Sequence, residues 1–445
     1  MDYDSKKNKK DLDFYTRCSG EEVWWKCHIC GDEKLRSIKS RAFNRRGCIF
    51  CRAKKTQADR ILEKISKEGS LLDNHPEIAI EWDFSKNKLR PENYLSTSDT
   101  EVILHLISTA KGTLIDRIVY ALQSIAGAFS LVLLTNDSLI GVRDPFGIRP
   151  LVLGKLNDTY ILSSESCGLD IIGADLIRDV EPGEILIIKN NTINSIKPFK
   201  KTYLRPCLFE YIYFSRPDSI LEGRNVYDVR KSIGHQLAVE NPNDNKIIDV
   251  VIPIPDSGNA SALGYSEKIK KPFEFGIIRN HYTGRTFIED SISVRNLSVK
   301  LKHNPNIFSF KDKSIALVDD SIVRGTTSVK IVEMLRNCGV KNVHMRIASP
   351  PVKHPCFYGI DTPTKEELLA SKFTIDQIKK YIGADSLKFV TLDGVYKALG
   401  FQNGREKEKP MFTDHYFSGD YPVKLIDQDA GIYPAQLSLL IEPTK

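Results

Sequence analysis

The feature that most constrains this chain is an apolar stretch that ends in two adjacent acids and continues into a loop of small residues. Residues 315–318 are apolar, Asp319 and Asp320 follow, and a helix-compatible stretch begins near Ser328. In an open parallel sheet, ligands bind beyond the carboxyl ends of the strands, and the amides that open the next helix can hold a phosphate. The order strand, acids, loop and helix therefore predicts a site for a phosphorylated ligand.

Each residue type around this loop has an expected role. Asp319 and Asp320 can hold ribose hydroxyls and a hard cation, because carboxylate oxygens are ligands that suit Mg²⁺. Gly325 lets the backbone approach a ligand closely. The residues expected to bind phosphate or substrate are Ser321, Arg324, Gly325, Thr326, Thr327 and Ser328. The alternative is an ordinary strand of a doubly wound fold that ends in acids.

Helical and strand patterns alternate from about residue 227 onward. Strands are expected at 250–254, 314–318 and 343–348, and a helix at 328–337. Alternation of this kind predicts an α/β domain in which helices cover both faces of a parallel sheet.

The preceding residues follow a different pattern. A helix is expected at 99–108, and short strands at 128–134, 161–163 and 184–188. Turn residues separate the strands, which predicts a separate layer of short strands before the parallel sheet.

The segment 314–328 resembles the phosphoribosyl pyrophosphate signature of type I phosphoribosyltransferases. Further stretches resemble one family in order, the amidophosphoribosyltransferases, and these stretches are 206–219, 252–258, 282–287, 354–361 and 382–387. The resemblance covers about residues 98–421. It implies a type I phosphoribosyltransferase domain preceded by a partial N-terminal-nucleophile glutaminase layer of the α+β class.

The resemblance also implies a reaction. Ammonia displaces pyrophosphate from phosphoribosyl pyrophosphate and gives 5-phosphoribosylamine, the first step of de novo purine synthesis. Because departure of pyrophosphate leaves oxocarbenium-like charge on the sugar, catalysis requires a fixed leaving group and metal and the exclusion of water. By analogy, Asp256 and Ser257 meet the pyrophosphate, and a basic segment from 279 to 302 folds over the substrate. The residues expected to be catalytic are Asp319, Asp320, Tyr282, Arg285 and Lys302.

In this family an N-terminal cysteine releases ammonia from glutamine, with its own α-amine as the base. This chain starts with Met1, its first cysteine is Cys18, and the resemblance begins near Ser98, part-way through the glutaminase layer. We therefore expect glutamine to be used only if the nucleophile half is supplied in trans. The face left by the absent strands is expected to pack on the transferase domain, on another subunit or on a separately encoded glutaminase half. A decayed glutaminase is the alternative.

Some members of the family bind a four-iron cluster through four cysteines. Cys207 and Cys356 match two of these positions, whereas residues 411–419 contain no cysteine to match the other two. Because two thiolates cannot replace four, we expect no iron–sulfur cluster, and we expect Cys207 and Cys356 to be buried as small apolar residues.

Four further cysteines have the spacing of a closed zinc site. Cys27 and Cys30 are followed, after seventeen residues, by Cys48 and Cys51. Four thiolates saturate a tetrahedral Zn²⁺, so the metal is expected to be structural. Residues 20–95 also resemble a zinc-ribbon or treble-clef module. The alternative is four unrelated reduced cysteines.

The basic excess of the chain lies in the same region. Residues 1–60 hold 16 Lys and Arg against 9 Asp and Glu, which accounts for the whole net charge of +7. Phe43 and Phe50 lie among the cations around the second cysteine pair. This arrangement favours either nucleic-acid binding or a solvated basic face.

These observations predict a cytoplasmic homo-oligomer with no membrane segment and no secretory signal. The expected divisions are a basic tail (1–20), a zinc module (21–57), a connector (58–97), a partial glutaminase-type domain (98–204), a phosphoribosyltransferase domain (205–400) and a C-terminal segment (401–445). The alternative function is that of a non-catalytic protein that contains zinc, binds nucleotide or nucleic acid, and carries a retired transferase domain.

Overall fold

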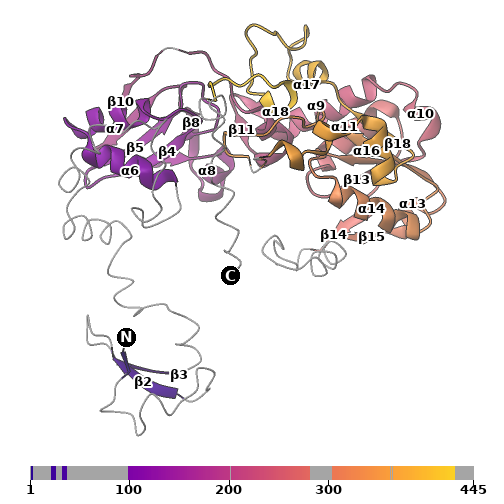
Figure 1. Ribbon diagram of the computed structural model, residues 1–445, viewed down its shortest axis with the longest axis horizontal. Coiled ribbons are helices and arrows are strands. Elements are labelled where there is room, and N and C mark those ends of the chain that lie inside the picture. The colour runs from indigo at the N-terminus through magenta and orange to yellow at the C-terminus, as the bar shows by residue number, and fades with distance from the viewer. Residues whose placement is uncertain are drawn as a thin grey trace. The chain divides into compact units, whose positions relative to one another are not determined.

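The computed structural model describes three short N-terminal strands and residues 99–200, 202–280, 303–360, 362 and 364–425. The chain divides into two units, Met1–Ser124 and Ile125–Lys445. Figure 1 labels many of the helices and strands of both units.

Among its described residues, the first unit contains a small antiparallel sheet and two helices. Strand β2 (Glu22–Lys26) pairs with both β1 (Asp2–Tyr3) and β3 (Glu33–Ser37). Helix α6 (Asp99–Thr109) confirms the predicted helix, and α7 (Leu114–Gln123) follows it. The side chain of Thr113 accepts a hydrogen bond from the amide of Asp116, and the Asp116 carboxylate accepts one from the amide of Thr113. This reciprocal cap fixes the start of α7.

The second unit begins with two antiparallel sheets, which we call the two-sheet layer. One sheet has the order β10-β9-β5-β4 and the other the order β7-β6-β8. Leu153 and Leu186 belong to the apolar core between the sheets. The elements of the layer are β4 (Ser130–Leu134), β5 (Ser138–Arg143), β6 (Val152–Leu156), β7 (Thr159–Ser163), α8 (Ser166–Ile172), β8 (Asp175–Asp179), β9 (Ile185–Lys189) and β10 (Thr192–Ile196).

The second unit continues as the parallel-sheet domain. Its strands have the order β13-β16-β17-β18 and all run parallel. They are β13 (Val250–Pro253), β16 (Ser314–Asp319), β17 (Asn342–Ile347) and β18 (Ser386–Phe389). Successive residues of a strand point to opposite faces of the sheet. Val251 and Ala316 accordingly pack in one apolar cluster, and Val250 and Ile315 in another.

Helices cover both faces of this sheet, as the sequence predicted (Figure 1). Residues of α9 (Val226–Val239), α11 (Asn259–Ile269) and α17 (Leu392–Ala398) belong to the first cluster. Residues of α14 (Thr326–Asn337) and α16 (Ile375–Ile382) belong to the second. The shorter elements are η3 (Glu210–Phe214), β11 (Ile220–Leu221), β12 (Arg224–Asn225), α10 (Asp244–Ile247), β14 (Ile277–Arg279), β15 (His303–Pro305), α13 (Ile307–Phe310), η4 (Lys365–Glu367), α15 (Leu369–Lys372) and α18 (His415–Ser418).

Helices α9 and α11 touch through their backbones. A Cβ atom added to Gly234 would lie 1.8 Å from the carbonyl oxygen of Ser261, and one added to Gly264 would lie 1.9 Å from that of Lys231. Both positions therefore require glycine. Because α11 begins directly after the loop that carries Asp256 and Ser257, this close contact helps to fix that loop.

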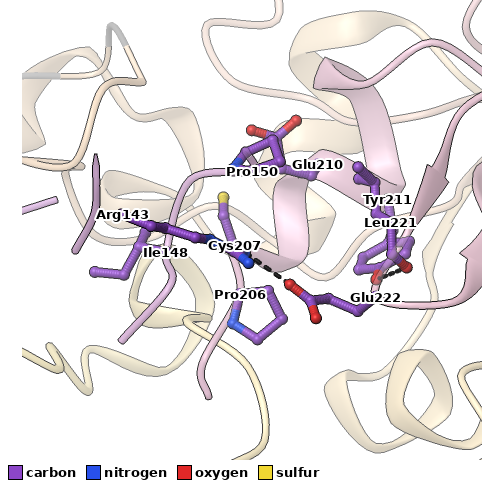
Figure 2. Close-up of a pocket in the computed structure, with 9 residues that line it drawn as sticks. All are labelled: Arg143, Ile148, Pro150, Pro206, Cys207, Glu210, Tyr211, Leu221 and Glu222. Atoms are coloured by element: carbon purple, nitrogen blue, oxygen red, sulfur yellow. Dashed lines mark hydrogen bonds and ion pairs between the residues drawn. The ribbon is translucent and has the colours of Figure 1, made fainter. Parts of the chain in front are cut away.

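The two-sheet layer contacts the parallel-sheet domain through hydrogen bonds and an ion pair, whereas the partner of the face left by the absent strands stays a prediction. The amide of Cys207 donates to the carbonyl of Ile148 over 2.9 Å. Arg143 of β5 forms a buried ion pair with Glu222, with 2.7 Å between Nη2 and Oε1. Figure 2 shows this pair beside a cavity of about 10 Å³ that residues from both sides line. A cavity of this size holds about one water molecule.

One strip of the layer is not covered. Val132 and Leu134 of β4 pair with Gly141 and Leu139 of β5, so they lie on the face that meets the second sheet. Leu134 nevertheless remains 82% exposed and Val132 52% exposed. Strand β7 has β6 as its single partner among the described residues, and the second sheet ends there. None of the described helices combines the length and apolarity needed to span a bilayer.

Candidate active site

Three segments of the predicted site meet at the carboxyl edge of the parallel sheet. Pro253 at the end of β13 pairs with Val318, and Asp319 at the end of β16 pairs with Ile347. The loop with Asp256 and Ser257 follows β13, whereas the loop 320–325 and α14 follow β16. Both loops that carry predicted ligand-binding residues therefore lie at the carboxyl edge of the parallel sheet, where a ligand is expected to bind.

The two acids are buried and close to each other. Asp319 is 8% exposed and Asp320 is 6% exposed. The amide of Asp320 donates to Oδ1 of Asp319 over 2.9 Å, and the hydroxyl of Ser321 donates to Oδ1 of Asp320 over 2.5 Å. The side chain of Ser257 lies near Asp320 and lowers the pKa of its carboxyl group, and the amide of Ile254 after β13 donates to the carbonyl of Val318 in β16 over 2.8 Å.

Burial raises the pKa of both carboxyl groups. For Asp319, the neighbouring charge of Asp320 raises the pKa further. For Asp320, hydrogen bonds from Ser257 and Ser321 and the charge of Arg230 oppose the effect of burial. Adjacent carboxylates in a water-poor site favour a proton or a cation between them. Oxygen donors of this kind fit Mg²⁺, so the two side chains suit the predicted metal.

The phosphate loop ends in a residue that requires glycine. Gly325 has a φ of +73° and immediately precedes α14. A Cβ atom at this position would lie 2.7 Å from Cδ2 of Leu369. The amides of Thr326, Thr327 and Ser328 open the helix, where backbone N–H groups have no intrahelical acceptor. Thr326 and Thr327 are exposed, whereas Ser328 is buried.

Two predicted ligand-binding residues are engaged in ion pairs. Nε of Arg324 lies 2.8 Å from Oε2 of Glu367. Asp256 is paired with Arg279, the last residue of β14. Neither Glu367 nor Arg230 was predicted from the sequence, because no motif links them to residues 319–328. Tyr282, Arg285 and Lys302 lie outside the described residues.

A tyrosine occupies the space beside the two cysteines that match cluster ligands. Sγ of Cys207 lies 3.1 Å from Oη of Tyr416, and this hydroxyl donates to the carbonyl of Thr413 over 2.7 Å. Burial raises the pKa of Cys207 to about 12 and also raises the pKa of Cys356. The predicted burial of both thiols is thus confirmed. Within the described ranges, no three His, Cys, Asp or Glu side chains are grouped to hold a metal ion.

The four cysteines of the predicted zinc site lie outside the described residues. Their donor chemistry nevertheless fits the metal, since two pairs of thiolates with this spacing are typical of structural zinc.

Three family models match the chain. A probable treble clef zinc finger domain matches residues 1–54, a glutamine amidotransferase domain matches 72–170, and a phosphoribosyl transferase domain matches 218–349.

Individual relatives agree with these matches. The chain is 50% identical over 352 residues to an amidophosphoribosyltransferase of Rhizobium etli, with 78% of this chain and 70% of the relative covered. It is 47% identical over 331 residues to the chloroplastic amidophosphoribosyltransferase 1 of Arabidopsis thaliana, with 74% of this chain and 57% of the relative covered.

A solved structure is similar as well. It is a glutamine phosphoribosylpyrophosphate amidotransferase from B. subtilis, complexed with ADP and GMP. The two chains are 40% identical with a TM-score of 0.70, and the match covers 79% of this chain and 75% of the other.

Proposed function

We propose, since the chain belongs to the amidophosphoribosyltransferase family, that its parallel-sheet domain forms 5-phosphoribosylamine from phosphoribosyl pyrophosphate and ammonia. The observation that carries this proposal is the buried pair Asp319 and Asp320 beside the open amides of α14. A retired site would have no need to keep this pair buried at a cost in free energy.

Each part of the site has a role in this reaction. The first-turn amides of α14 and the hydroxyls of Thr326 and Thr327 bind the 5′-phosphate. Asp319 and Asp320 orient the ribose hydroxyls, and the loop with Ser257 holds the pyrophosphate. Bound Mg²⁺ would neutralise charge on the leaving group, with the two carboxylates to hold it.

The chemical step exchanges one bond at the sugar for another. The bond from C1 of ribose to the pyrophosphate oxygen breaks, and the electron pair leaves with pyrophosphate. The nitrogen of ammonia forms the new bond to C1 and then releases a proton to solvent. Because the nucleophile is neutral, the residues that we assign stabilise the leaving group and the sugar cation and do not activate ammonia.

The test is pyrophosphate release with ammonia or with glutamine. We expect release with ammonia, its loss on addition of EDTA, and its return with excess Mg²⁺. The variant carrying Asp319→Asn and Asp320→Asn should show no release. Binding of phosphoribosyl pyrophosphate without any release by the wild type would instead favour the non-catalytic alternative.

Ammonia is the proposed nitrogen donor because no described cysteine suits nucleophilic attack on glutamine. Cys167, Cys207 and Cys356 are buried, and Cys338 ends α14 away from the two-sheet layer. We propose that a glutaminase half on another polypeptide covers Val132 and Leu134 and completes the second sheet beside β7. Without such a half, Val132 and Leu134 would remain an exposed apolar strip, and exposed apolar patches often mark interaction sites. Glutamine-dependent release on addition of that polypeptide tests this proposal.

The N-terminal module is proposed to hold one structural Zn²⁺ and to bind nucleic acid through its cations. The excess of Lys and Arg in residues 1–60 supports this proposal. Affinity for a DNA or RNA duplex should fall steeply as salt rises, because bound cations displace counterions from phosphates. An affinity that does not change with salt would contradict it.

A further inference from the structure

A buried ion pair joins the two-sheet layer to the turn that opens the parallel-sheet domain. Nη1 of Arg149 lies 3.0 Å from Oε1 of Glu210, the first residue of η3. Glu210 is 4% exposed, and the hydroxyl of Ser215 donates to its other carboxylate oxygen over 2.5 Å. The guanidinium of Arg149 also lies over the ring of Phe214, 5.2 Å from its centroid. Arg149 therefore contacts both ends of η3.

The same turn holds a second buried arginine. Arg230 of α9 donates from Nε to the carbonyl of Tyr211 over 2.9 Å, and from Nη2 to that of Ser215 over 2.7 Å. The hydroxyl of Ser261 on α11 donates to the carbonyl of Arg230 over 3.1 Å. Two backbone carbonyls, one in η3 and one directly after it, thus hold the guanidinium of Arg230. The close contact of α9 with α11 fixes the backbone of Arg230.

Arg230 is also joined to the helix behind the loop with Ser257, because its carbonyl accepts from Ser261 in the first turn of α11. Its charge acts on Asp320 and opposes the effect of burial on that carboxyl group. A π-helical turn such as η3 is a rare element that occurs frequently at functional sites. Arg149 and Glu210 fix the conformation of η3 from the two-sheet layer. Because Arg230 of α9 is hydrogen-bonded to carbonyls of η3 and of Ser215, a change in η3 should displace Arg230.

We propose that Glu210 is a positioning residue of the transferase reaction, held by Arg149 of the two-sheet layer, and that it fixes the turn whose carbonyls hold Arg230, the residue that is hydrogen-bonded to the start of α11 behind the loop with Ser257. This inference rests on the proposed function. It gives the two-sheet layer a part in phosphoribosyl transfer that does not depend on glutamine hydrolysis. Glu210 touches no reacting atom and acts through Arg230.

A second ion pair provides a matched control. Arg178 donates to both carboxylate oxygens of Glu184 over 2.7 Å, and Glu184 is buried. Both residues belong to the two-sheet layer and neither contacts η3. Replacing Arg178 by Met should therefore lower the stability of the layer and leave Arg230 in place. Replacing Arg149 should lower the stability of the layer and also displace Arg230.

The test is steady-state kinetics with ammonia as nitrogen donor and varied phosphoribosyl pyrophosphate. We expect Arg149→Met and Glu210→Gln to lower kcat/KM by about 10- to 100-fold, since small misplacements of catalytic groups have effects of this order. Arg178→Met should remain within about twofold. Arg149→Lys should recover only part of the loss, because lysine keeps the charge that pairs with Glu210 but lacks the planar guanidinium that lies over Phe214.

The melting temperature of each variant is measured beside its kinetics. Equal losses of kcat/KM in Arg149→Met and Arg178→Met would overturn the inference, and so would unchanged kcat/KM in Glu210→Gln. A wild type that releases no pyrophosphate would refute the proposed function instead. In that case, calorimetric binding of magnesium phosphoribosyl pyrophosphate tests the inference. Arg149→Met should weaken this binding, and Arg178→Met should leave it unchanged.

Discussion

Replacing Asp244 by leucine should strongly destabilise the parallel-sheet domain. Asp244 accepts from Nε of Arg346 over 2.6 Å and from Nη2 over 2.7 Å, and Arg346 is 1% exposed. The hydroxyl of Tyr265 hydrogen-bonds to the same carboxylate. Removing one partner of a buried pair leaves an uncompensated charge, which costs about 3–5 kcal/mol. A typical domain has only about 5–15 kcal/mol of stability.

The assay is urea unfolding followed by far-UV circular dichroism. Tryptophan fluorescence is unsuitable because Trp24, Trp25 and Trp82 all precede residue 99. The midpoint should fall in Asp244→Leu with little change in the slope of free energy against urea.

Two comparisons separate loss of the buried pair from general damage. Adding Arg346→Met to Asp244→Leu removes both charges and should recover most of the stability. Asp376→Asn breaks an exposed pair with Lys379, 3.3 Å apart, and should cost less than about 0.5 kcal/mol. If Asp244→Leu costs no more than Asp376→Asn, the assignment of the buried pair is wrong.

Two further perturbations probe the packing around the site. Gly234→Ala would place Cβ 1.8 Å from the carbonyl oxygen of Ser261 and should lower the free energy of unfolding by about 3 kcal/mol. Ser232→Ala, on the exposed side of α9, should leave the free energy of unfolding nearly unchanged. Equal urea midpoints of the two variants would contradict the close contact of α9 with α11. Burial, with the nearby charge of Arg205, lowers the pKa of His415 to about 3, so the unfolded chain takes up a proton between about pH 6.5 and 3 that the folded chain does not. The free energy of unfolding should therefore fall as pH decreases through this range, by at most about 1.4 kcal/mol per pH unit. His415→Phe should reduce that dependence in urea midpoints measured at several pH values, and an unchanged dependence would exclude His415 as its source.

The sequence predicted those parts of the fold that depend on local pattern. The apolar run before Asp319 became β16, and the stretch near Ser328 became α14, which begins two residues earlier at Thr326. The helix at 99–108 and the strands at 128–134, 161–163 and 184–188 are confirmed with small shifts of their ends. In the two-sheet layer and the parallel sheet, β5, β6, β8, β10 and β18 were not predicted, because polar residues or glycine interrupt their apolar residues.

Tertiary contacts account for the site residues that the sequence did not reveal. Glu367 contacts Arg324 across 43 residues of sequence, and Ser261 of α11 contacts Arg230 of α9 across 31 residues. No local spacing encodes such contacts. The divisions after residues 97, 204 and 400 stay predictions, as do the roles of Tyr282 and Arg285.

Calorimetric titration of magnesium phosphoribosyl pyrophosphate into the purified chain tests the central claim most directly. The wild type should bind it, and the variant with Asn at positions 319 and 320 should bind at least about 100-fold more weakly, a difference of about 2.7 kcal/mol. The variant should fold normally, because it removes two adjacent buried charges and keeps the shape of both side chains. Equal affinities of the two proteins would contradict the assignment of the acids as the ribose and metal site.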